Sequence, residues 1–348
     1  MRAVVLQGER EVTVEDVADP ALPGEDGIIV RVERAAICGS DMHLYHGPLM
    51  IPGVRLGHEF VGTVEDAGGE VHTVKPGDRV LVSGVIGCGR CVACRAGDPV
   101  TCRRNGTKVF GTSLELHGGQ AEAVAVPAAD ASVLPIPEGV TDEQAVLLTD
   151  ILPTGYLAAQ RANISPGDTV VIVGLGPVGT LALQCAQLFG PGRVLAVDMV
   201  PERLANAARL GAEPVNASEG GGAVAQVLEK TNGRGAAAVI EAVGADQTIT
   251  DAIYCAAPGG TISVVGVNLN PAFSFPMPVV LLKALTYRMT LASIPSTWDA
   301  LVPLLTAGRL HPEDVFTHRF ALGDTPDAYR LFESREDGVI KVLIDTTA

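Results

Sequence analysis

The segment "DTVVIVGLGPVG", residues 168–179, restricts the fold more than any other part of this sequence. Its first half is a continuous apolar run, which is typical of a parallel strand that is buried on both faces of a sheet. The glycines that follow have the G-x-G-x-x-G spacing of a turn that closes a strand and opens a helix. The segment therefore predicts a strand, a tight turn and a helix in succession.

Strands and helices continue to alternate after this turn. The expected order is the helix "PVGTLALQCAQLFG", the strand "RVLAVD", the helix "PERLANAARLGA", the strand "AAAVIEAVG", a helix near "TITDAIYCAA" and the strand "GTISVVGV". Successive strand–helix–strand units predict an α/β domain with a doubly wound parallel sheet, the Rossmann arrangement. We expect this domain at residues 151–285.

The glycine turn also predicts a dinucleotide site. Gly174 permits the tight turn, Gly176 lets a pyrophosphate approach the backbone, and Gly179 lets the helix pack closely on the strand. Pro177 and Val178 open the helix, whose first N–H groups would bind the phosphates.

Asp198 ends the next strand, 19 residues after the last glycine of the turn. A carboxylate at this place accepts ribose hydroxyls and repels a 2′-phosphate, so the pattern favours NAD over NADP. The alternative is a glycine turn followed by a surface aspartate, and the strand–turn–helix context disfavours it.

The residues before this domain predict a β-rich unit. The stretches "GIIVRVERAAI", "EFVGTVEDAG", "DRVLVSG" and "AEAVAVPA" mix β-branched residues with partial alternation. At "TDEQAVLL" the pattern changes, because Thr141 and Gln144 form a capping box that predicts a helix. The tail, residues 286–348, returns to a strand, a helix and a strand. We expect it to pack back on the first domain, residues 1–150.

Four cysteines lie within "GCGRCVACRAGDPVTC", residues 87–102, and a disulfide framework, a redox pair or a metal site would each use such a cluster. The N-terminus lacks the basic and apolar regions of a secretion signal, so we expect a cytoplasmic protein with reduced thiols. The chain has seven cysteines, an odd number that prevents complete pairing. The spacing favours a closed structural zinc site, with no position for a substrate, formed by Cys88, Cys91, Cys94 and Cys102.

Charge excludes several classes of partner. The formal net charge is −15, and no basic patch interrupts the acidic sequence, so neither nucleic acid nor an anionic membrane is an expected partner. The sequence also lacks an uninterrupted apolar run of about 18 residues, the length that a membrane span requires. A zinc-ribbon module that binds nucleic acid is therefore disfavoured.

Cys38 in "ICGSDMHLYHG" and His58 in "RLGHEFVG" each follow a strand-like stretch beside a glycine. Either residue alone would be an ordinary buried cysteine or a polar histidine. Several motifs, however, follow one another along the chain in this order: "CGSDMH", "GHEFVGTV", "PGDRV", the four-cysteine lobe, "GLGPVG", "AVDMVPERL" and "IKVLID". With these motifs in this order, the whole chain resembles the zinc-containing medium-chain alcohol dehydrogenase family. The resemblance implies a GroES-like catalytic domain, completed by the tail, around an inserted Rossmann domain.

The resemblance implies a catalytic zinc that is bound by Cys38, His58 and a third ligand in "LLTDILPTGY". Liver-type enzymes have a cysteine there, whereas this chain has Asp150. That departure is similar to the branch of bacterial secondary-alcohol dehydrogenases and glutathione-independent formaldehyde dehydrogenases. Glu59 matches a carboxylate of the family that either alternates as a zinc ligand or stands behind the ligands.

Further roles also come from the resemblance. Ser40 and His43 match the proton relay of the family, and Thr154 matches a residue beside the nicotinamide. Arg203 matches a basic residue near the adenosine ribose, and Lys341 is expected to reach the cofactor's phosphates from the tail. Two more expected cofactor contacts, at the ends of later strand segments, are Val243 and Val267.

Together these features predict an NAD-dependent zinc alcohol dehydrogenase with two zinc ions per chain. A thiolate, an imidazole and a carboxylate leave one zinc position open for the oxygen of an alcohol, ketone or aldehyde, and NAD exchanges the hydride. The chain lacks the long insertions of the formaldehyde-dismutating enzymes that it partly resembles, and this difference favours a secondary or larger alcohol as the substrate. The alternatives are a polyol or L-threonine 3-dehydrogenase, a zinc-free quinone reductase, and an inactive NAD-binding structural protein. The family resemblance implies a homodimer or homotetramer.

Overall fold

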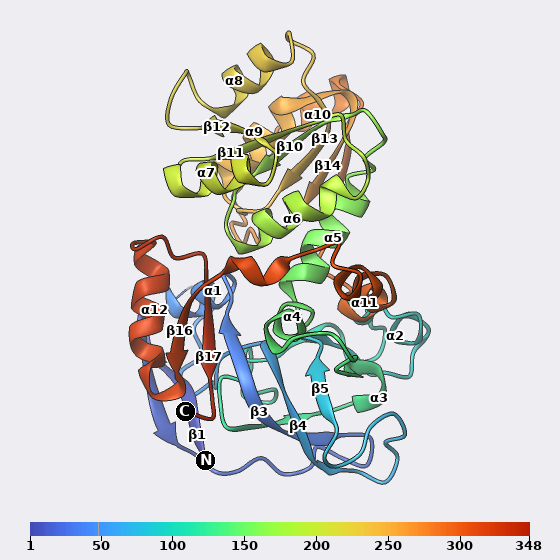
Figure 1. Ribbon diagram of the computed structural model, residues 1–348, viewed down its shortest axis with the longest axis vertical. Coiled ribbons are helices and arrows are strands. Elements are labelled where there is room, and N and C mark those ends of the chain that lie inside the picture. Colours follow the sequence, from blue (N-terminus) through green and yellow to red (C-terminus); the bar gives the residue numbers. More distant parts are fainter. Residues whose placement is uncertain (48) are drawn as a thin grey trace. The chain divides into compact units, whose positions relative to one another are not determined.

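The computed structural model describes residues 1–47 and 49–348, and these form two compact units (Figure 1). One unit combines Met1–Pro153 with Ser293–Ala348, and the other is Thr154–Ala292. The boundaries predicted from the sequence lie after residues 150 and 285. The second boundary lies later because strand β15 (Thr286–Met289) still belongs to the sheet of the second unit. Its side chains are largely exposed, so no buried apolar run marks it in the sequence.

The second unit contains a six-stranded sheet in the order β12-β11-β10-β13-β14-β15, and every neighbouring pair is parallel. This order confirms the predicted doubly wound fold. The other strands are β10 (Thr169–Val173), β11 (Arg193–Asp198), β12 (Glu213–Asn216), β13 (Ala236–Glu241) and β14 (Ala256–Val264). The helices are α6 (Pro177–Gln187), α7 (Pro201–Arg209), α8 (Ala223–Lys230), α9 (Asp246–Cys255) and α10 (Met277–Leu282).

The strand order reverses between β10 and β13, which are neighbours although β11 and β12 separate them in the chain. Val173 pairs with Glu241 at this point, so the carboxyl ends of both strands lie at one edge of the sheet. Ligands of open α/β sheets bind outside the carboxyl ends at such a reversal. The glycine turn that begins at Gly174 therefore stands at the position where a dinucleotide would bind.

The first unit is built on a seven-stranded sheet in the order β16-β17-β3-β4-β5-β9, with β8 also paired to β3. Its strands are β3 (Ile28–Ile37), β4 (Glu59–Ala67), β5 (Arg79–Val82), β8 (Ala123–Val126), β9 (Val133–Pro135), β16 (Phe316–Ala321) and β17 (Lys341–Asp345). Two-stranded sheets join β1 (Arg2–Gly8) to β2 (Glu11–Asp16) and β6 (Val85–Ile86) to β7 (Lys108–Val109). The C-terminal tail thus adds β16 and β17 to the sheet that the N-terminal segment begins.

Helices connect and cover this first sheet. They are α1 (Asp41–Tyr45), α2 (Val92–Arg95), α3 (Ala129–Ser132), α4 (Asp142–Leu147), α11 (Trp298–Thr306) and α12 (Thr325–Ser334), and α5 (Ile151–Arg161) runs from this unit into the second. The predicted capping box at α4 is present in both directions between Thr141 and Gln144. None of the helices in residues 1–47 and 49–348 has the length and apolar character needed to cross a membrane.

Close strand packing fixes the centre of the first unit. A Cβ on Gly62 of β4 would overlap the carbonyl oxygen of Arg31 on β3, so only glycine fits between these two strands. The core around them is apolar and continues into the tail, where Ala328 and Tyr329 of α12 are fully buried. Because the ends of β3 and β4 carry the candidate metal ligands, this packing holds the site in place.

Candidate metal and cofactor sites

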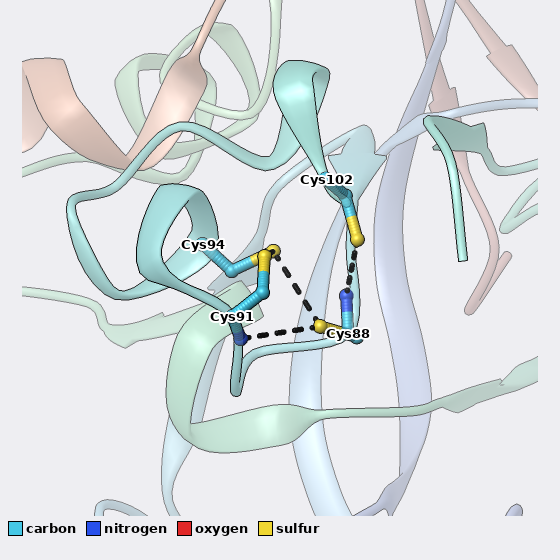
Figure 2. Close-up of side chains that lie close together, drawn as sticks. All are labelled: Cys88, Cys91, Cys94 and Cys102. Carbon is cyan, nitrogen blue, oxygen red and sulfur yellow. Dashed lines mark hydrogen bonds between the residues drawn. The ribbon is translucent and has the colours of Figure 1, made fainter. Parts of the chain in front are cut away.

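The four cysteines of residues 87–102 converge on one point (Figure 2). Their sulfurs all lie within 4.8 Å of one another. The sulfur of Cys94 is 4.0 Å from that of Cys88 and 3.5 Å from that of Cys91. A disulfide requires about 2.05 Å, whereas four thiolates at about 2.3 Å around a tetrahedral zinc would be roughly 3.8 Å apart. The spacing therefore fits a metal and not a disulfide, and all four cysteines are free.

Backbone N–H groups are directed at these sulfurs. The N–H of Cys88 donates to the sulfur of Cys102, and the N–H of Cys91 donates to the sulfur of Cys88. Hydrogen bonds from the backbone of Cys94 and Arg103 lower the pKa of Cys91 to about 6. Burial raises the pKa of Cys94 to about 12, with a further contribution from Cys91. A divalent cation would displace the thiol protons, and four converging sulfurs are the donor set expected for a structural zinc.

The two cysteines of the second unit behave differently. Burial raises the pKa of Cys185 to about 12, and burial followed by Asp251 raises the pKa of Cys255 to about 12. Both are fully buried in or at the end of helices. They are core residues with neutral thiols, as their helical positions in the sequence indicate.

A second cluster brings together Cys38, His58 and Asp150, whose ligand atoms also lie within 4.8 Å of one another. One carboxylate oxygen of Asp150 is 3.6 Å from the Cys38 sulfur and 3.3 Å from Nε2 of His58. Cys38 directly follows β3 and His58 directly precedes β4. These strands are antiparallel, with Ala36 opposite Glu59, so the two ligands meet at one end of the pair.

Asp150 reaches this place by a separate route. It stands between α4 and α5, and the residue before it, Thr149, accepts a hydrogen bond of 2.9 Å from the N–H of Gly84. A Cβ on Gly84 would lie 2.7 Å from the carbonyl oxygen of His58. The absence of a side chain at Gly84 therefore lets the α4–α5 connection approach the His58 segment closely.

Ser40 lies against the predicted ligands. Its hydroxyl is 3.3 Å from the sulfur of Cys38 and 3.3 Å from Nε2 of His58. His43 is half-buried on α1, and burial together with the neighbouring His46 lowers its pKa. The imidazole of His43 is thus kept neutral and able to accept a proton.

A buried chain of polar groups that the sequence did not predict lies behind His58. Asp41 approaches Nδ1 of His58 at 3.2 Å with one carboxylate oxygen, and its other oxygen accepts the N–H of Cys38 at 3.0 Å. Gln120 donates to that second oxygen at 3.4 Å, and the hydroxyl of Tyr329 donates to Gln120 at 2.9 Å. Asp41 could have been found from its place beside Ser40 in "CGSDMH", whereas Gln120 and Tyr329 have no motif.

Glu59 and Lys341 form a fully buried ion pair. Burial alone would lower the pKa of Lys341, but Glu59 and Cys38 raise it, so the ammonium persists. This placement differs from the expected reach of Lys341 to cofactor phosphates, because its ammonium is bound to Glu59 inside the first unit. The group of ligand atoms within 4.8 Å does not include Glu59 among the residues that the structure describes.

The donor set of the second cluster fits zinc. A thiolate, an imidazole and a carboxylate are typical zinc ligands, and three of them leave one position open. Burial alone would lower the pKa of His58, yet Asp41 and then Cys38 raise it well above its ordinary value. The same convergence of anionic groups that favours an imidazolium favours a divalent cation bound to His58.

The glycine turn of the second unit has the geometry that its spacing predicts. Gly174 has φ +90°, which favours glycine, and a Cβ on Gly179 would overlap the carbonyl oxygen of Gly174. Gly176 precedes Pro177 at the start of α6, and the nearest atom to a Cβ on Gly176 would be the Arg203 guanidinium at 3.9 Å. The backbone at Gly176 is therefore open to an approaching phosphate. Val178, on the first turn of α6, is half-buried.

Asp198 is held beside this turn. One carboxylate oxygen accepts the N–H of Leu175 at 2.7 Å, and the other accepts the N–H groups of Met199 and Val200 at 2.7 and 3.0 Å. The guanidinium of Arg203 lies 3.9 Å from the oxygen that Leu175 binds. The carboxylate is thus fixed by the backbone at the end of β11, with Arg203 next to it.

The remaining predicted cofactor residues lie in the same unit. Val243 follows β13 and is 47% exposed, and a Cβ on Gly174 would overlap its side chain. Val267 follows β14, and its backbone packs against Gly244. Thr154 lies on α5.

Comparisons with known proteins identify the family of the chain. Residues 24–138 match the alcohol dehydrogenase GroES-like domain, and residues 177–307 match the zinc-binding dehydrogenase domain. A probable zinc-binding alcohol dehydrogenase of Mycobacterium tuberculosis is 49% identical over 96% of this chain and 86% of its own length. The chain belongs to the zinc-type medium-chain alcohol dehydrogenase family, whose members are oxidoreductases.

Solved structures extend this assignment to the fold. An alcohol dehydrogenase from a Thermus species superposes with a TM-score of 0.92 and 41% identity over 99% of both chains. A zinc-binding dehydrogenase from Sinorhizobium meliloti, solved with NADP, has a TM-score of 0.84 and 29% identity over 99% of this chain and 98% of its own. The GroES-like domain match of this zinc-type dehydrogenase contains Cys38, His58 and the four-cysteine lobe.

Metal analysis tests the two clusters separately. We expect two zinc ions per chain, and we expect Asp150→Ala and Cys94→Ser each to lose one. Asp150→Ala removes an anionic ligand from an open site, so turnover disappears while the melting temperature stays near that of the wild type. Cys94→Ser opens a closed site whose metal binding is coupled to folding, so the melting temperature falls by several degrees. Elemental analysis and calorimetry provide the two measurements.

Cys185→Ser is the matched control for these variants. Cys185 is a fully buried cysteine of α6 outside both clusters, so this variant should keep both zinc ions. If either ligand variant also kept two zinc ions, the residue concerned would not be a ligand.

Proposed function

We propose that this protein is an NAD-dependent zinc alcohol dehydrogenase that catalyses reversible hydride transfer between NAD and a secondary or larger alcohol. The observation that carries the proposal is the convergence of Cys38, His58 and Asp150 with the Ser40 hydroxyl in reach of two of them. Asp150 in the third ligand position supports the branch of secondary-alcohol and glutathione-independent formaldehyde dehydrogenases. We expect the protein to act in the cytoplasm on a small molecule.

Zinc bound at Cys38, His58 and Asp150 would favour loss of a hydroxyl proton, as it lowers the pKa of water from about 15.7 to about 7, and NAD would accept the hydride. The surrounding residues keep the ligands in one orientation. Asp41 accepts from both the His58 ring and the Cys38 backbone, so it fixes which ring nitrogen is free to bind. The buried ion pair of Glu59 and Lys341 has no net charge and links β4 to β17, the strands on either side of β3.

Oxidation of an alcohol also releases a proton, which must leave the buried cluster. Ser40 is the group that can accept it, because its hydroxyl lies beside two of the ligand atoms. His43 stands one helical turn further on, and its lowered pKa keeps it unprotonated near neutral pH. We infer that the proton passes from the substrate hydroxyl to Ser40, then to His43, and from there to water.

Removing the two relay groups should affect turnover unequally. Ser40→Ala is expected to reduce kcat by about 100-fold or more, the lower end of general acid–base contributions, with zinc content unchanged. His43→Gln should reduce kcat less, because water can replace the imidazole. Since burial lowers the pKa of His43, wild-type kcat should fall only at pH values below the ordinary histidine range, where His43 becomes protonated.

The pH dependence of kcat from pH 5 to 9 and stopped-flow rates of hydride transfer give these measurements. The acid limb of the profile should move in His43→Gln, and His72→Gln is the control, because His72 is an exposed histidine outside both clusters. An identical rate and profile in Ser40→Ala and His43→Gln would show that the proton leaves by another route.

We base the choice between NAD and NADP on Asp198 and not on the family, because one structural relative was solved with NADP. Three backbone N–H groups fix the carboxylate beside the glycine turn, which supports a role in binding the ribose hydroxyls. A 2′-phosphate at this place would approach a negative charge. We therefore assign NAD, with Arg203 beside the adenosine ribose, and Gly174, Gly176 and Gly179 at the pyrophosphate.

A spectrophotometric screen tests both the reaction and the cofactor. Wild-type protein should reduce NAD, and not NADP, with members of a panel of primary, secondary, cyclic and polyol alcohols, and secondary or larger alcohols should give the highest kcat/KM. Asp198→Ala should raise the KM for NAD about tenfold or more and allow measurable NADP reduction, because the acceptor and the repelling charge are both lost.

Asp150→Ala is the control that reports activity independent of the metal cluster. NAD binding without turnover on any alcohol would favour a structural NAD-binding protein. A wild-type preference for NADP would overturn the role of Asp198.

We further propose that the protein forms a homodimer or homotetramer through the β15 edge of the six-stranded sheet in the second unit. Strand β15 is the last in its sheet, so one row of its backbone groups has no strand beside it within the described residues. The neighbouring α10 exposes Leu281 at 76% and Leu282 at 85%, and Met277 at 62%. Apolar side chains this exposed are typical of a surface that a second copy covers.

Charge substitution on this face should separate the subunits. The double variant Leu281→Glu with Leu282→Glu is expected to elute as a monomer where the wild type is a dimer or larger, by light scattering after size exclusion. Val92→Glu is the control, because Val92 is a 78% exposed apolar residue of the cysteine lobe. The face is not the interface if both variants keep the wild-type mass.

A further inference from the structure

We propose that Glu241 is a positioning residue for the cofactor: its carboxylate holds the Val243–Gly244 turn against Gly174, where the dinucleotide is inferred to bind. The proposal rests on the proposed function in one respect, the binding of a nicotinamide dinucleotide at this edge. It assigns to Glu241 a role that none of the motifs in the sequence indicates.

Glu241 occupies the position where the sheet reverses its strand order. It is the last residue of β13, opposite Val173, the last residue of β10. The chain continues from Val173 into the glycine turn and from Glu241 into Ala242 and Val243. Both connections therefore leave the sheet side by side at the edge that binds ligands in doubly wound folds.

The carboxylate of Glu241 binds its own downstream turn. One oxygen accepts the N–H of Val243 at 2.9 Å, the N–H of Gly244 at 2.8 Å and the hydroxyl of Thr248 at 2.8 Å. Thr248 lies in the first turn of α9, whose N-cap, Ala245, has no side-chain acceptor. A single buried oxygen thus fixes the turn and the start of the next helix together.

Glycines leave no free space around this arrangement. Gly244 has φ +84°, and a Cβ there would overlap the backbone of Val267. A Cβ on Gly266 would overlap the N–H of Gly244 and lie 2.7 Å from the second carboxylate oxygen of Glu241. The carboxylate is therefore enclosed by backbone, and the turn that it binds has one position available.

The turn places the exposed apolar side chain of Val243 at the edge of the sheet where the dinucleotide is inferred to bind. Val243 is 47% exposed, and its side chain occupies the space that a Cβ on Gly174 would fill. A displaced Val243 would leave this place beside Gly174, the residue whose backbone turn opens the pyrophosphate site. The position of Val243, and so the access of a dinucleotide to Gly174, depends on the three hydrogen bonds to Glu241.

The cost of burying this acid supports a functional role. Glu241 is fully buried, and its second oxygen has no hydrogen-bond partner among the described residues. Burial raises its pKa, although the N–H of Gly244 and the Thr248 hydroxyl act in the opposite direction. A buried polar atom without a partner lowers stability, and the three hydrogen bonds at the other oxygen offset that loss. The oxygen of this side chain accepts two N–H groups and a hydroxyl, which an apolar side chain could not do.

Direct binding of NAD⁺ and NADH to zinc-loaded protein tests the proposal. Glu241→Ala should raise both dissociation constants at least tenfold, measured by calorimetry and by NADH fluorescence well below the melting temperature. Glu241→Gln keeps an oxygen acceptor and should bind within about threefold of the wild type. Saturating NAD should restore kcat in Glu241→Ala, because lost binding that is uniform along the reaction appears in KM.

Two further variants separate positioning from general stability. Thr231→Val removes another buried hydroxyl of the same unit, one that donates to the carbonyl of Val227 and accepts the N–H of Gly235. It should lower the melting temperature and leave the dissociation constants unchanged. Thr248→Val removes one of the three donors to Glu241 and should weaken NADH binding by a smaller factor, so the proposal stays testable if Glu241→Ala does not fold.

The outcomes distinguish this proposal from the proposed function. Wild-type protein that binds neither NAD(H) nor NADP(H) would refute the proposed function, and with it the assignment of Glu241. Wild-type protein that binds NADH, together with a folded Glu241→Ala that binds it equally well, would refute the role of Glu241 alone.

Discussion

The register of β3 against β4 and β17 is the constraint on which the metal cluster depends. β3 pairs with β4 so that Ala36 lies opposite Glu59, and with β17 so that Ile37 lies opposite Val342. Cys38, His58, Glu59 and Lys341 are consequently next to these pairs, although Glu59 and Lys341 are 282 residues apart in the chain. A slip of one residue would turn alternate side chains to the opposite face of the sheet and separate the ligands.

The two metal clusters depend on the fold to different degrees. The cysteine lobe collects its four ligands from one short loop, and its own backbone N–H groups bind the sulfurs. The second cluster joins residues that lie 112 positions apart, at Cys38 and Asp150. A closed site made locally can stabilise a loop, whereas an open site needs a sheet that holds its ligands before any substrate arrives. This difference is why Cys94→Ser is expected to act on stability and Asp150→Ala on turnover.

Sequence patterns predicted the elements that are both long and buried. The strands "RVLAVD" and "DTVVIV" appear as β11 and β10, and the helix of the glycine turn begins at Pro177 as expected. β12 escaped because its four residues, "EPVN", contain Glu, Pro and Asn, which rarely favour strands. α8 and α10 follow glycine- and proline-rich segments with no cap that a sequence pattern detects. Short or exposed elements form because other elements pack against them. A local sequence pattern holds no information about those contacts.

The same limit applies to the sites. Spacing identified the cysteine lobe and the glycine turn because their ligands are close in sequence, and the resemblance supplied Cys38, His58 and Asp150. The order of residues could not indicate that Gln120 and Tyr329 stand behind Asp41. These contacts join three segments that are far apart in the chain: the segment before β8, helix α1 and helix α12. Nor could it show that Lys341 turns inward to Glu59. These contacts exist only once the tail has joined the sheet.

Two buried acids connect the fold to the inferred chemistry. Glu59 begins β4 and Glu241 ends β13, and each has one carboxylate oxygen without a hydrogen-bond partner among the described residues. The oxygen without a partner carries a desolvation penalty of about 1–3 kcal/mol, and an apolar side chain at either place would in turn leave buried donors without an acceptor. Each acid lies at a strand end beside a proposed site, one next to the metal ligands and one next to the glycine turn. Each carboxylate is explained by what it holds: the ammonium of Lys341 beside the metal cluster, and the turn that keeps Val243 beside Gly174.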